Sequence, residues 1–292
     1  TDPQWQAHAW QTGILAVNVS AESCRQWSPL NLYRRQLSSA FCQYVPTRYA
    51  WGGPGPEAGF SHAMIAAKRS AANNFKHGED IGVIKSAVPA TSIEEWIPGG
   101  RHWSQLERLI RAAQQRRQAP FPWSCVRIQG FVWMQGESDA HSDSKARRWL
   151  QNFRWLRQNV SEVSQSRSRL LPTVIGRTHV HAVNRQGVLA TLREAQRLAG
   201  EDPGTVMVDL DELPLLEKKR QKEHFSTMGY VEMGTRFAHA MIGLLASTTD
   251  GAQQIRTSDS AVRDVSNRPR EGIIDTTEDF AVDVVYTWVG AP

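Results

Sequence analysis

The chain has 292 residues, of which 40% are hydrophobic and 22% charged, and its formal net charge is +5. These proportions are typical of soluble globular proteins and exclude disordered and fibrous architectures. No run approaches the ~18 apolar residues that a membrane-spanning helix needs, and three cysteines are too few for a disulfide scaffold or a zinc site. The basic residues are scattered and accompany no nucleic-acid-binding motif, so we expect a solvated surface without a nucleic-acid partner. A basic module that binds polyanions is a further functional hypothesis, which is supported by the net charge alone.

Short apolar runs alternate along the chain with longer amphipathic segments, a pattern typical of helices packed on a parallel sheet. The predicted strands cover residues 81–84, 126–134, 171–175 and 205–210. The predicted helices cover residues 104–118, 146–160 and 228–245, and a Ser104–Glu107 capping box opens the first of them. The expected fold is therefore an α/β three-layer sandwich, in which helices flank a parallel sheet.

The composition changes after Ala246 to mostly Ser, Thr, Asp, Gly and Arg. We therefore predict a main domain over 1–246, a linker over 247–279, and the start of a second domain over 280–292. The β-branched and aromatic run 282–289 is the predicted first strand of that second domain.

Residues 133–139, with the sequence WMQGESD, directly follow a predicted strand and precede a predicted helix. Their polar side chains would emerge at the carboxyl end of the strand, where open α/β sheets bind their ligands. The segment resembles the sialate O-acetylesterase domain and carbohydrate esterase family 6, within the SGNH hydrolases. Three further segments resemble this family in the same order: IGVIKSAVPATSIEEW (81–96), LREAQ (192–196) and EHFSTMG (223–229). The resemblance covers about residues 50–246.

The resemblance implies an SGNH-type (flavodoxin-like) α/β fold and hydrolysis of O-acetyl esters on carbohydrates by a serine nucleophile, with no metal and no cofactor. His224 would be the general base, and Glu137 would orient it or anchor the motif. The Gln135 side-chain amide and the Ala90 N–H would be the oxyanion donors. Such a reaction needs an activated hydroxyl, a base and preorganised donors. Trp133 and Thr91 are the expected substrate-binding residues for an acetylated carbohydrate.

The sequence departs from the family pattern at three places. The nucleophile motif Gly-Gln-Ser-Asn is absent, so we expect the first strand of the family to lie upstream of Thr1 or to be missing altogether, and no nucleophile is predicted. Pro89–Ala90 stands where the family has paired glycines, and Gln221 stands where it has an aspartate. These departures favour the alternative function, a catalytically inactive esterase-like domain that binds glycans.

Each predicted site residue also has a structural interpretation. His224 could cap a helix or lie on the surface, Glu137 could pair with an arginine, and Gln135 could bond loop backbone. For His179 and His181 we prefer a structural role to metal binding, because no third ligand is evident.

The terminal run VDVVYTWV (282–289) resembles the opening of the Stealth family of sugar-phosphate transferases. That resemblance implies a fused C-terminal transferase domain, and a β-rich tail is the equally supported alternative. The compartment in which the protein works is not predicted.

Overall fold

The computed structural model describes residues 15–20, 23–29, 42–44, 55–70, 82–114, 128–164, 170–216, 224–260 and 285–288. The strands are β1 (Leu15–Ser20), β2 (Ser23–Pro29), β3 (Cys42–Tyr44), β4 (Gly82–Ser86), β5 (Phe131–Met134), β6 (Thr173–Gly176), β7 (Thr205–Val208) and β8 (Val285–Trp288). The α-helices are α2 (Pro56–Ser70), α3 (Trp103–Gln114), α4 (Asp143–Val163), α5 (Gln186–Gly200) and α6 (Thr227–Ser260). Two short 3-10 helices, η3 (Ile93–Glu95) and η4 (Asp139–His141), follow β4 and β5.

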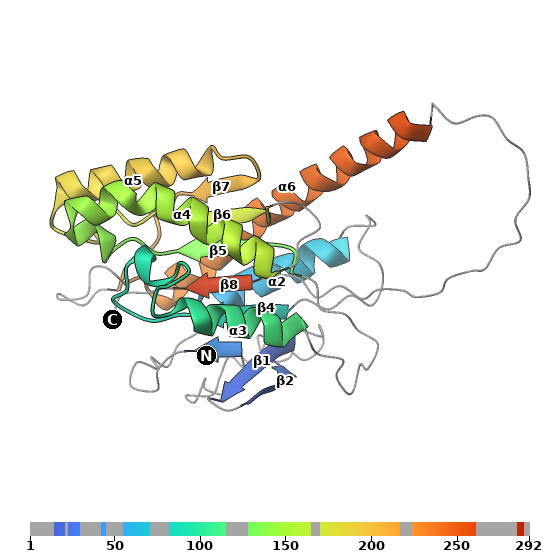
Figure 1. The fold of residues 1–292 in the computed structure, drawn as a ribbon, viewed down its shortest axis with the longest axis horizontal. Coiled ribbons are helices and arrows are strands. Elements are labelled where there is room, and N and C mark those ends of the chain that lie inside the picture. The colour runs from blue at the N-terminus through green and yellow to red at the C-terminus, as the bar shows by residue number, and fades with distance from the viewer. Residues whose placement is uncertain are drawn as a thin grey trace, which may run out of the picture.

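The strands form a sheet in the order β2-β1-β4-β8-β5-β6-β7, with β3 also paired to β4. All neighbouring pairs in the part β4-β8-β5-β6-β7 of the sheet are parallel, whereas β2 is antiparallel to β1. Helices flank the sheet, as Figure 1 shows. The predicted α/β sandwich with a parallel sheet is therefore confirmed.

The two faces of the sheet bury alternate residues of each strand. Ile84, Trp133 and Ile175 belong to the core under α3, α4 and α5, whereas their neighbours Val83 and Val132 belong to the core under α2 and α6. Successive side chains of a strand point to opposite faces, so a strand buried on both sides is apolar at nearly every position. This burial explains why β5 and β6 read as continuous apolar runs.

Helices α2 and α6 cross closely enough to require glycine on both sides. A Cβ at Gly59 would overlap the Val231 carbonyl oxygen, and one at Gly234 would overlap the Pro56 carbonyl oxygen. Because these overlaps involve backbone, a side chain could be accommodated only by separating the helices. The crossing fixes the start of α6 beside the start of α2, near the carboxyl end of β4.

Several predicted boundaries differ from the structure. Helix α3 begins at Trp103, so Ser104 lies inside it and the predicted capping box is wrong. A capping box forms instead at Ser92 and Glu95, where η3 begins. Helix α6 continues through Ser260, so the change of composition after Ala246 does not end the helix.

The structure also contains strands that the sequence interpretation left out or assigned elsewhere. Strands β1, β2 and β3 were not predicted, although Leu15, Val17 and Val19 alternate with smaller or polar residues. Strand β8, within the predicted strand 282–289, lies in the same sheet between β4 and β5. None of the helices in the described part of the chain combines the length and apolar composition that a membrane crossing requires.

Candidate active site

The loops after β4 and β5 are joined through one buried carboxamide. The Gln135 Nε2 donates to the Thr91 carbonyl oxygen at 2.8 Å and to the Asp139 carboxylate, and Trp149 Nε1 donates to Gln135 Oε1 at 3.2 Å. The Gln135 side chain is 1% exposed. Thr91, Gln135, Asp139 and Trp149 are called the buried cluster below. Its central amide already uses both N–H groups, so Gln135 holds the two loops together.

Among the described residues, none with a cationic side chain lies at hydrogen-bond distance from Asp139 in this cluster. Its carboxylate accepts the Ile93 N–H at 3.1 Å as well as the Gln135 amide. Burial raises the pKa of Asp139 to about 6, although the hydrogen bonds from Gln135 and Ile93 and the charge of Lys145 favour the ionised form. The carboxyl group therefore changes its protonation state in mildly acidic solution.

The two expected substrate contacts lie in the core. The Thr91 hydroxyl donates to the Val88 carbonyl oxygen at 2.9 Å and accepts the Trp96 indole N–H at 3.0 Å. Trp133 is fully buried and packs edge-on against Trp96, with ring centroids 5.9 Å apart. Both residues are buried, whereas Ala90, which directly precedes Thr91 in the loop after β4, is exposed.

Ala90 is exposed at the turn after β4 and has φ 56°, in the left-handed region. Residues other than glycine rarely adopt this conformation, because their Cβ approaches the backbone. The loop thus takes a backbone path suited to glycine, at one of the two positions where the family pattern has glycine.

Glu137 and the loop before α6 approach each other around Tyr230. Glu137 is half-buried, and its Oε2 accepts the Gly136 N–H at 3.1 Å. Burial raises the pKa of Tyr230, and the negative charges of Glu137 and Glu57 raise it further. Glu137 therefore lies close enough to act electrostatically on the first turn of α6.

His224 lies half-buried just before α6, and its carbonyl oxygen accepts the Leu216 N–H at 2.8 Å. The next residue, Phe225, is buried and packs edge-on against Tyr230, with ring centroids 5.8 Å apart. His224 thus directly precedes Phe225, which packs against Tyr230, the residue whose pKa the charge of Glu137 helps to raise.

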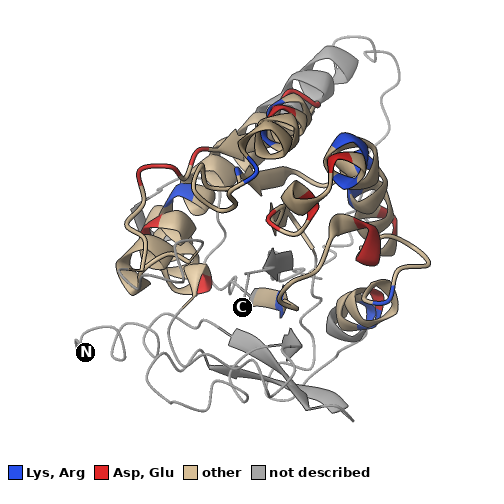
Figure 2. Cartoon of the chain, turned by 90° about the vertical axis from the view of Figure 1, so that its left-hand side faces the viewer, with Lys and Arg blue, Asp and Glu red and all other residues tan. Residues whose placement is uncertain are grey.

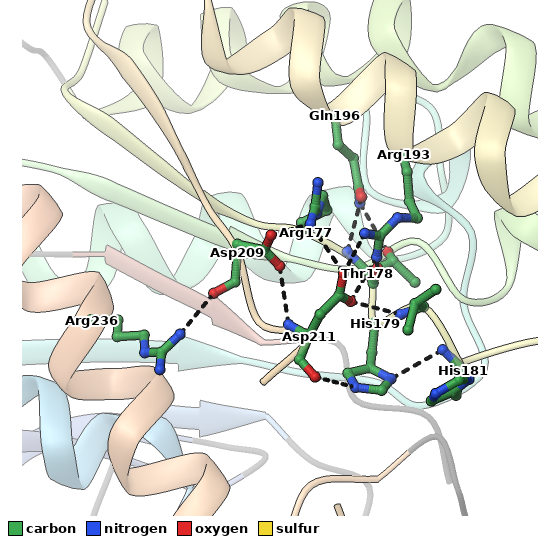
Figure 3. A network of polar contacts seen from close by, with 10 residues as sticks. Arg177, Thr178, His179, His181, Arg193, Gln196, Asp209, Asp211 and Arg236 are labelled. Carbon is green, nitrogen blue, oxygen red and sulfur yellow. Dashed lines mark hydrogen bonds and ion pairs between the residues drawn. The ribbon is translucent and has the colours of Figure 1, made fainter. Parts of the chain in front are cut away.

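A second polar cluster lies at the carboxyl ends of β6 and β7 (Figure 3). The Arg193 guanidinium donates to both oxygens of Asp211, at 2.9 and 2.5 Å, and Arg177 Nη2 donates to Asp211 Oδ2 at 3.0 Å. Arg177 also pairs with Asp209. These four residues are called the arginine cluster below.

The arginine cluster lowers the pKa of Asp211. Partial burial acts to raise this pKa, but hydrogen bonds from Arg193 and the Val180 N–H, together with the charges of Arg193 and Arg177, outweigh it and bring the pKa to about 2. Asp211 is therefore ionised wherever the protein is folded near neutral pH.

His179 connects the arginine cluster to the loop that carries His224. Its Nδ1 accepts the His181 N–H at 3.1 Å, so the ring proton lies on Nε2, which is 3.1 Å from the Asp211 carbonyl oxygen. Burial lowers the pKa of His179, and its ring packs edge-on against Phe225 at 5.6 Å. Among the residues whose positions the structure gives, no three His, Cys, Asp or Glu side chains gather as a metal site would require.

The segment LREAQ supplies the link between the two clusters. Gln196 Nε2 donates to the Gln135 carbonyl oxygen at 3.1 Å and to the Thr178 hydroxyl at 2.9 Å, while its Oε1 accepts the Thr178 N–H. Arg193, one turn earlier on α5, holds Asp211. The motif therefore fixes the ends of β5, β6 and β7 relative to one another.

Several residues of this region were missed in the sequence interpretation. They are Glu57, Lys85, Asp139, Arg177, Tyr230 and the pairing of Arg193 with Asp211. One sequence signal was available, because Lys85 is a charged residue inside an otherwise apolar strand and requires a buried partner. The ion pairs between distant segments, such as that of Arg193 with Asp211, had no signal in the local sequence.

Basic and acidic residues are interspersed along the described helices, as the colouring in Figure 2 shows. Several of them pair on the same helix, as Arg111 does with Glu107 and Arg147 with Asp143. Along these helices the basic residues therefore do not form one continuous patch.

Comparisons with known proteins agree with this architecture. The family model described as carbohydrate esterase, sialic acid-specific acetylesterase, matches residues 8–243. A crystal structure of a protein from Arabidopsis thaliana has a TM-score of 0.54 and 23% sequence identity, covering 80% of this chain and 81% of that one. A carbohydrate acetylesterase from Xanthomonas citri has a TM-score of 0.47 and 17% identity, covering 68% and 43%. No protein with a curated description matches the sequence. The family match spans most of the chain, which therefore belongs to the sialic acid-specific acetylesterase family of carbohydrate esterases.

Proposed function

We propose that this protein hydrolyses O-acetyl esters on carbohydrates, with sialate or another acetylated glycan as substrate. The observation that carries the proposal is the match of residues 8–243 to the sialic acid-specific acetylesterase model. The residue types that follow β5 and precede α6, the polar Gln135 and Glu137 and the half-buried His224, also support it, because ester hydrolysis needs hydrogen-bond donors, a carboxylate and a base.

In the proposed mechanism His224 is the general base and Glu137 is the carboxylate that acts on it. A histidine has an ordinary pKa near working pH, so it can take a proton from a nucleophilic hydroxyl and return it to the leaving sugar oxygen. The attacking group is a serine, whose position along the chain we do not assign. The proposal requires no metal or cofactor.

The oxyanion site is proposed to include the backbone N–H of Ala90. In the described arrangement Gln135 acts through this loop, because its two N–H groups hold the Thr91 carbonyl oxygen and Asp139. Thr91 and Trp133 are buried, so in this proposal they hold the loop by packing and hydrogen bonding and do not contact the sugar. A backbone donor held in place before the reaction is effective because it needs no reorganisation as charge develops.

The test is acetate release from O-acetylated sialic acids and other acetylated sugars by the full-length protein. We expect the His224→Ala variant to lose activity by about 10²–10⁴-fold, the range for removal of a general base or triad member. His239→Ala, which changes an exposed histidine on the following helix α6, is the control and should keep its activity. Full turnover by His224→Ala would contradict the proposed mechanism.

A second candidate is a glycan-binding domain without hydrolysis. It is favoured by the engagement of both Gln135 N–H groups inside the protein, which leaves this amide no N–H for an oxyanion. This function predicts saturable binding of acetylated glycans with no acetate release. Acetate release by the wild-type protein, lost in His224→Ala, would exclude it.

For the run 282–289, a fused transferase domain stays a proposal. Strand β8 within this run pairs with β4 and β5 in the main sheet, which favours the alternative of a β-rich tail over the first strand of a separate domain.

A further inference from the structure

The turn after β4 has a backbone conformation that its sequence does not favour. Residues 88–91 have the sequence VPAT, Pro89 and Ala90 are the middle residues of the turn, and Ala90 has φ 56°. Proline at the first middle position and a positive φ at the second are features of a type II turn, in which the second middle residue is usually glycine or asparagine. Alanine at this position favours a type I turn, which keeps φ negative.

The two turn types differ mainly in the direction of one peptide group. Between type I and type II, ψ of the first middle residue changes by about 150° and φ of the second by about 170°, so the peptide between them turns over. Here that peptide joins Pro89 to Ala90. Its N–H is the Ala90 N–H, which donates to no backbone acceptor among the residues that the structure describes. The sign of φ at Ala90 therefore decides to which side of the loop this donor points.

Two side chains that follow β5 hold the residues after Ala90. Gln135 Nε2 donates to the Thr91 carbonyl oxygen at 2.8 Å, and the Asp139 carboxylate accepts the Ile93 N–H at 3.1 Å. Asp139 also accepts the second N–H of Gln135, so one carboxylate holds Gln135 and Ile93 together. All three hydrogen bonds are buried, and Asp139 is 1% exposed. Asp139 is therefore the common partner of the two attachments of this loop.

The Thr91 hydroxyl closes the turn. It donates to the Val88 carbonyl oxygen at 2.9 Å and accepts the Trp96 indole N–H at 3.0 Å, so the first and last residues of the turn are tied together. Gln135 and Asp139 attach this closed turn to the loop after β5. A strained backbone conformation persists only where its surroundings hold it, so contacts of this kind are required for the positive φ of Ala90.

We propose that Asp139 is a positioning residue, which holds the peptide between Pro89 and Ala90 in its type II orientation and so directs the Ala90 N–H toward the oxyanion. The inference rests on the proposed esterase function, in which the Ala90 N–H is an oxyanion donor. Asp139 is buried and does not touch the substrate, so it acts through Gln135, Ile93 and the turn.

The first measurement is kcat for acetate release, at a temperature at which every variant is folded. Asp139→Leu removes the shared acceptor, and we expect kcat to fall by about 10-fold, less than the 10²–10³-fold effect of deleting an oxyanion donor, with KM changed less than about threefold. Asp139→Asn keeps one acceptor oxygen and should lose less. In an Ala90→Gly background the loss caused by Asp139→Leu should shrink to less than about threefold, because glycine adopts a positive φ without strain.

The control is Asp211→Leu, which removes a carboxylate at the same edge of the sheet but outside this loop. Its effect on kcat should be the same with Ala90 and with Gly at position 90, because distant and independent sites add. The positioning role is overturned if Ala90→Gly does not reduce the loss caused by Asp139→Leu, or if it reduces the effect of Asp211→Leu equally. If Asp139→Leu does not fold, Asp139→Ser, whose hydroxyl is too short to reach both donors, replaces it in the same comparison.

The second measurement follows the peptide group without any need for catalysis. In protein labelled with ¹⁵N-alanine, the residual dipolar coupling of the Ala90 N–H reports the direction of this bond. We expect Asp139→Leu to change this coupling and Asp139→Asn to leave it close to that of wild type. An unaltered coupling in Asp139→Leu would overturn the inference. If wild type releases no acetate, the proposed function fails, and the coupling alone decides whether Asp139 holds the peptide.

Discussion

The buried cluster and the arginine cluster lie at the same edge of the sheet but hold a carboxylate in opposite ways. Asp139 is 1% exposed and is bound by a backbone N–H and a carboxamide, whereas Asp211 is partly exposed and is bound by two arginines. The first environment raises a carboxyl pKa to about 6, and the second lowers one to about 2. The pKa values of the two aspartates therefore differ because Asp211 has cationic partners and contact with solvent, and not because of the number of hydrogen bonds.

The difference indicates how the two halves of the edge are built. The buried cluster fixes the loops after β4 and β5 with neutral groups, so the charge of Asp139 is costly there. The arginine cluster fixes the ends of β6 and β7 with charges that remain accessible to water. Loss of one partner should therefore be more costly in the buried cluster than in the arginine cluster.

The largest expected effect is that of removing the Asp139 carboxylate. Asp139→Leu leaves the Ile93 N–H and one Gln135 N–H without a partner in a buried region, and we expect the free energy of unfolding to fall by about 3–5 kcal/mol. Asp211→Leu should cost about 1–3 kcal/mol, because the partly exposed arginines can turn toward water. Urea denaturation of both variants measures the two losses. A larger loss in Asp211→Leu than in Asp139→Leu would reverse the comparison.

The pH dependence of stability should have opposite slopes for the two aspartates. Asp139 has an ordinary pKa of 3.8 and a folded pKa of about 6, so between these values the folded state binds more proton than the unfolded state. Its contribution to stability therefore falls as the pH rises from about 4 to about 6, by about 3 kcal/mol at most, and stays constant above. In Asp139→Asn this decline should disappear.

Asp211 gives the reverse dependence, because its folded pKa is depressed. Its stabilisation is present above about pH 4 and is lost as the pH falls toward about 2. Urea denaturation of wild type, Asp139→Asn and Asp211→Asn between pH 2.5 and 7 separates the two contributions. A decline between pH 4 and 6 that persists in Asp139→Asn would show that another group causes it.

A smaller loss of stability is expected when one guanidinium group is removed from the arginine cluster. Arg193→Met removes two hydrogen bonds to Asp211 and one to the Thr178 carbonyl oxygen, while Arg177 continues to bind Asp211. We expect a loss of about 1–2 kcal/mol in thermal or urea unfolding. Arg197→Met, which removes only exposed pairs on the same helix, is the control and should cost less than Arg193→Met. Equal losses would indicate that the partial burial of Arg193 adds nothing.

The sequence alone was sufficient to predict the layers of the fold, because the signals for them are local. The apolar runs at β5 and β6 and the three- and four-residue spacing in α4 follow directly from burial on a sheet with two covered faces. Helix α6 was cut short because the sequence becomes polar after Ala246 although the helix continues. Strands β1 and β2 were missed although they are longer than β5 and β6, because their sequences LAVNVS and SCRQWSP contain no continuous apolar run, and β3 has only three residues.

The candidate active site was only partly accessible from the sequence. The segments around Gln135, His224 and Arg193 were found as motifs, but which partners their side chains choose depends on contacts between distant elements. Gln135 pairs with Thr91, 44 residues away, and Arg193 pairs with Asp211, 18 residues away. The partners of Gln135 in particular depend on the sheet bringing two loops together, which no local spacing encodes.

The smallest expected effect concerns the backbone that the buried cluster holds in place. Ala90 keeps φ 56° next to Thr91, whose carbonyl oxygen is bonded to Gln135, so the strain is maintained by its surroundings. Ala90→Gly should relieve it and raise stability by up to about 1 kcal/mol, since glycine adopts this region without the Cβ contact. Ala190→Gly, the same substitution at an exposed position inside α5, should instead lower stability by about 1 kcal/mol. Differential scanning calorimetry of both variants gives the two signs, and a loss of stability in Ala90→Gly as large as that in Ala190→Gly would mean that the buried cluster imposes no strain on the loop.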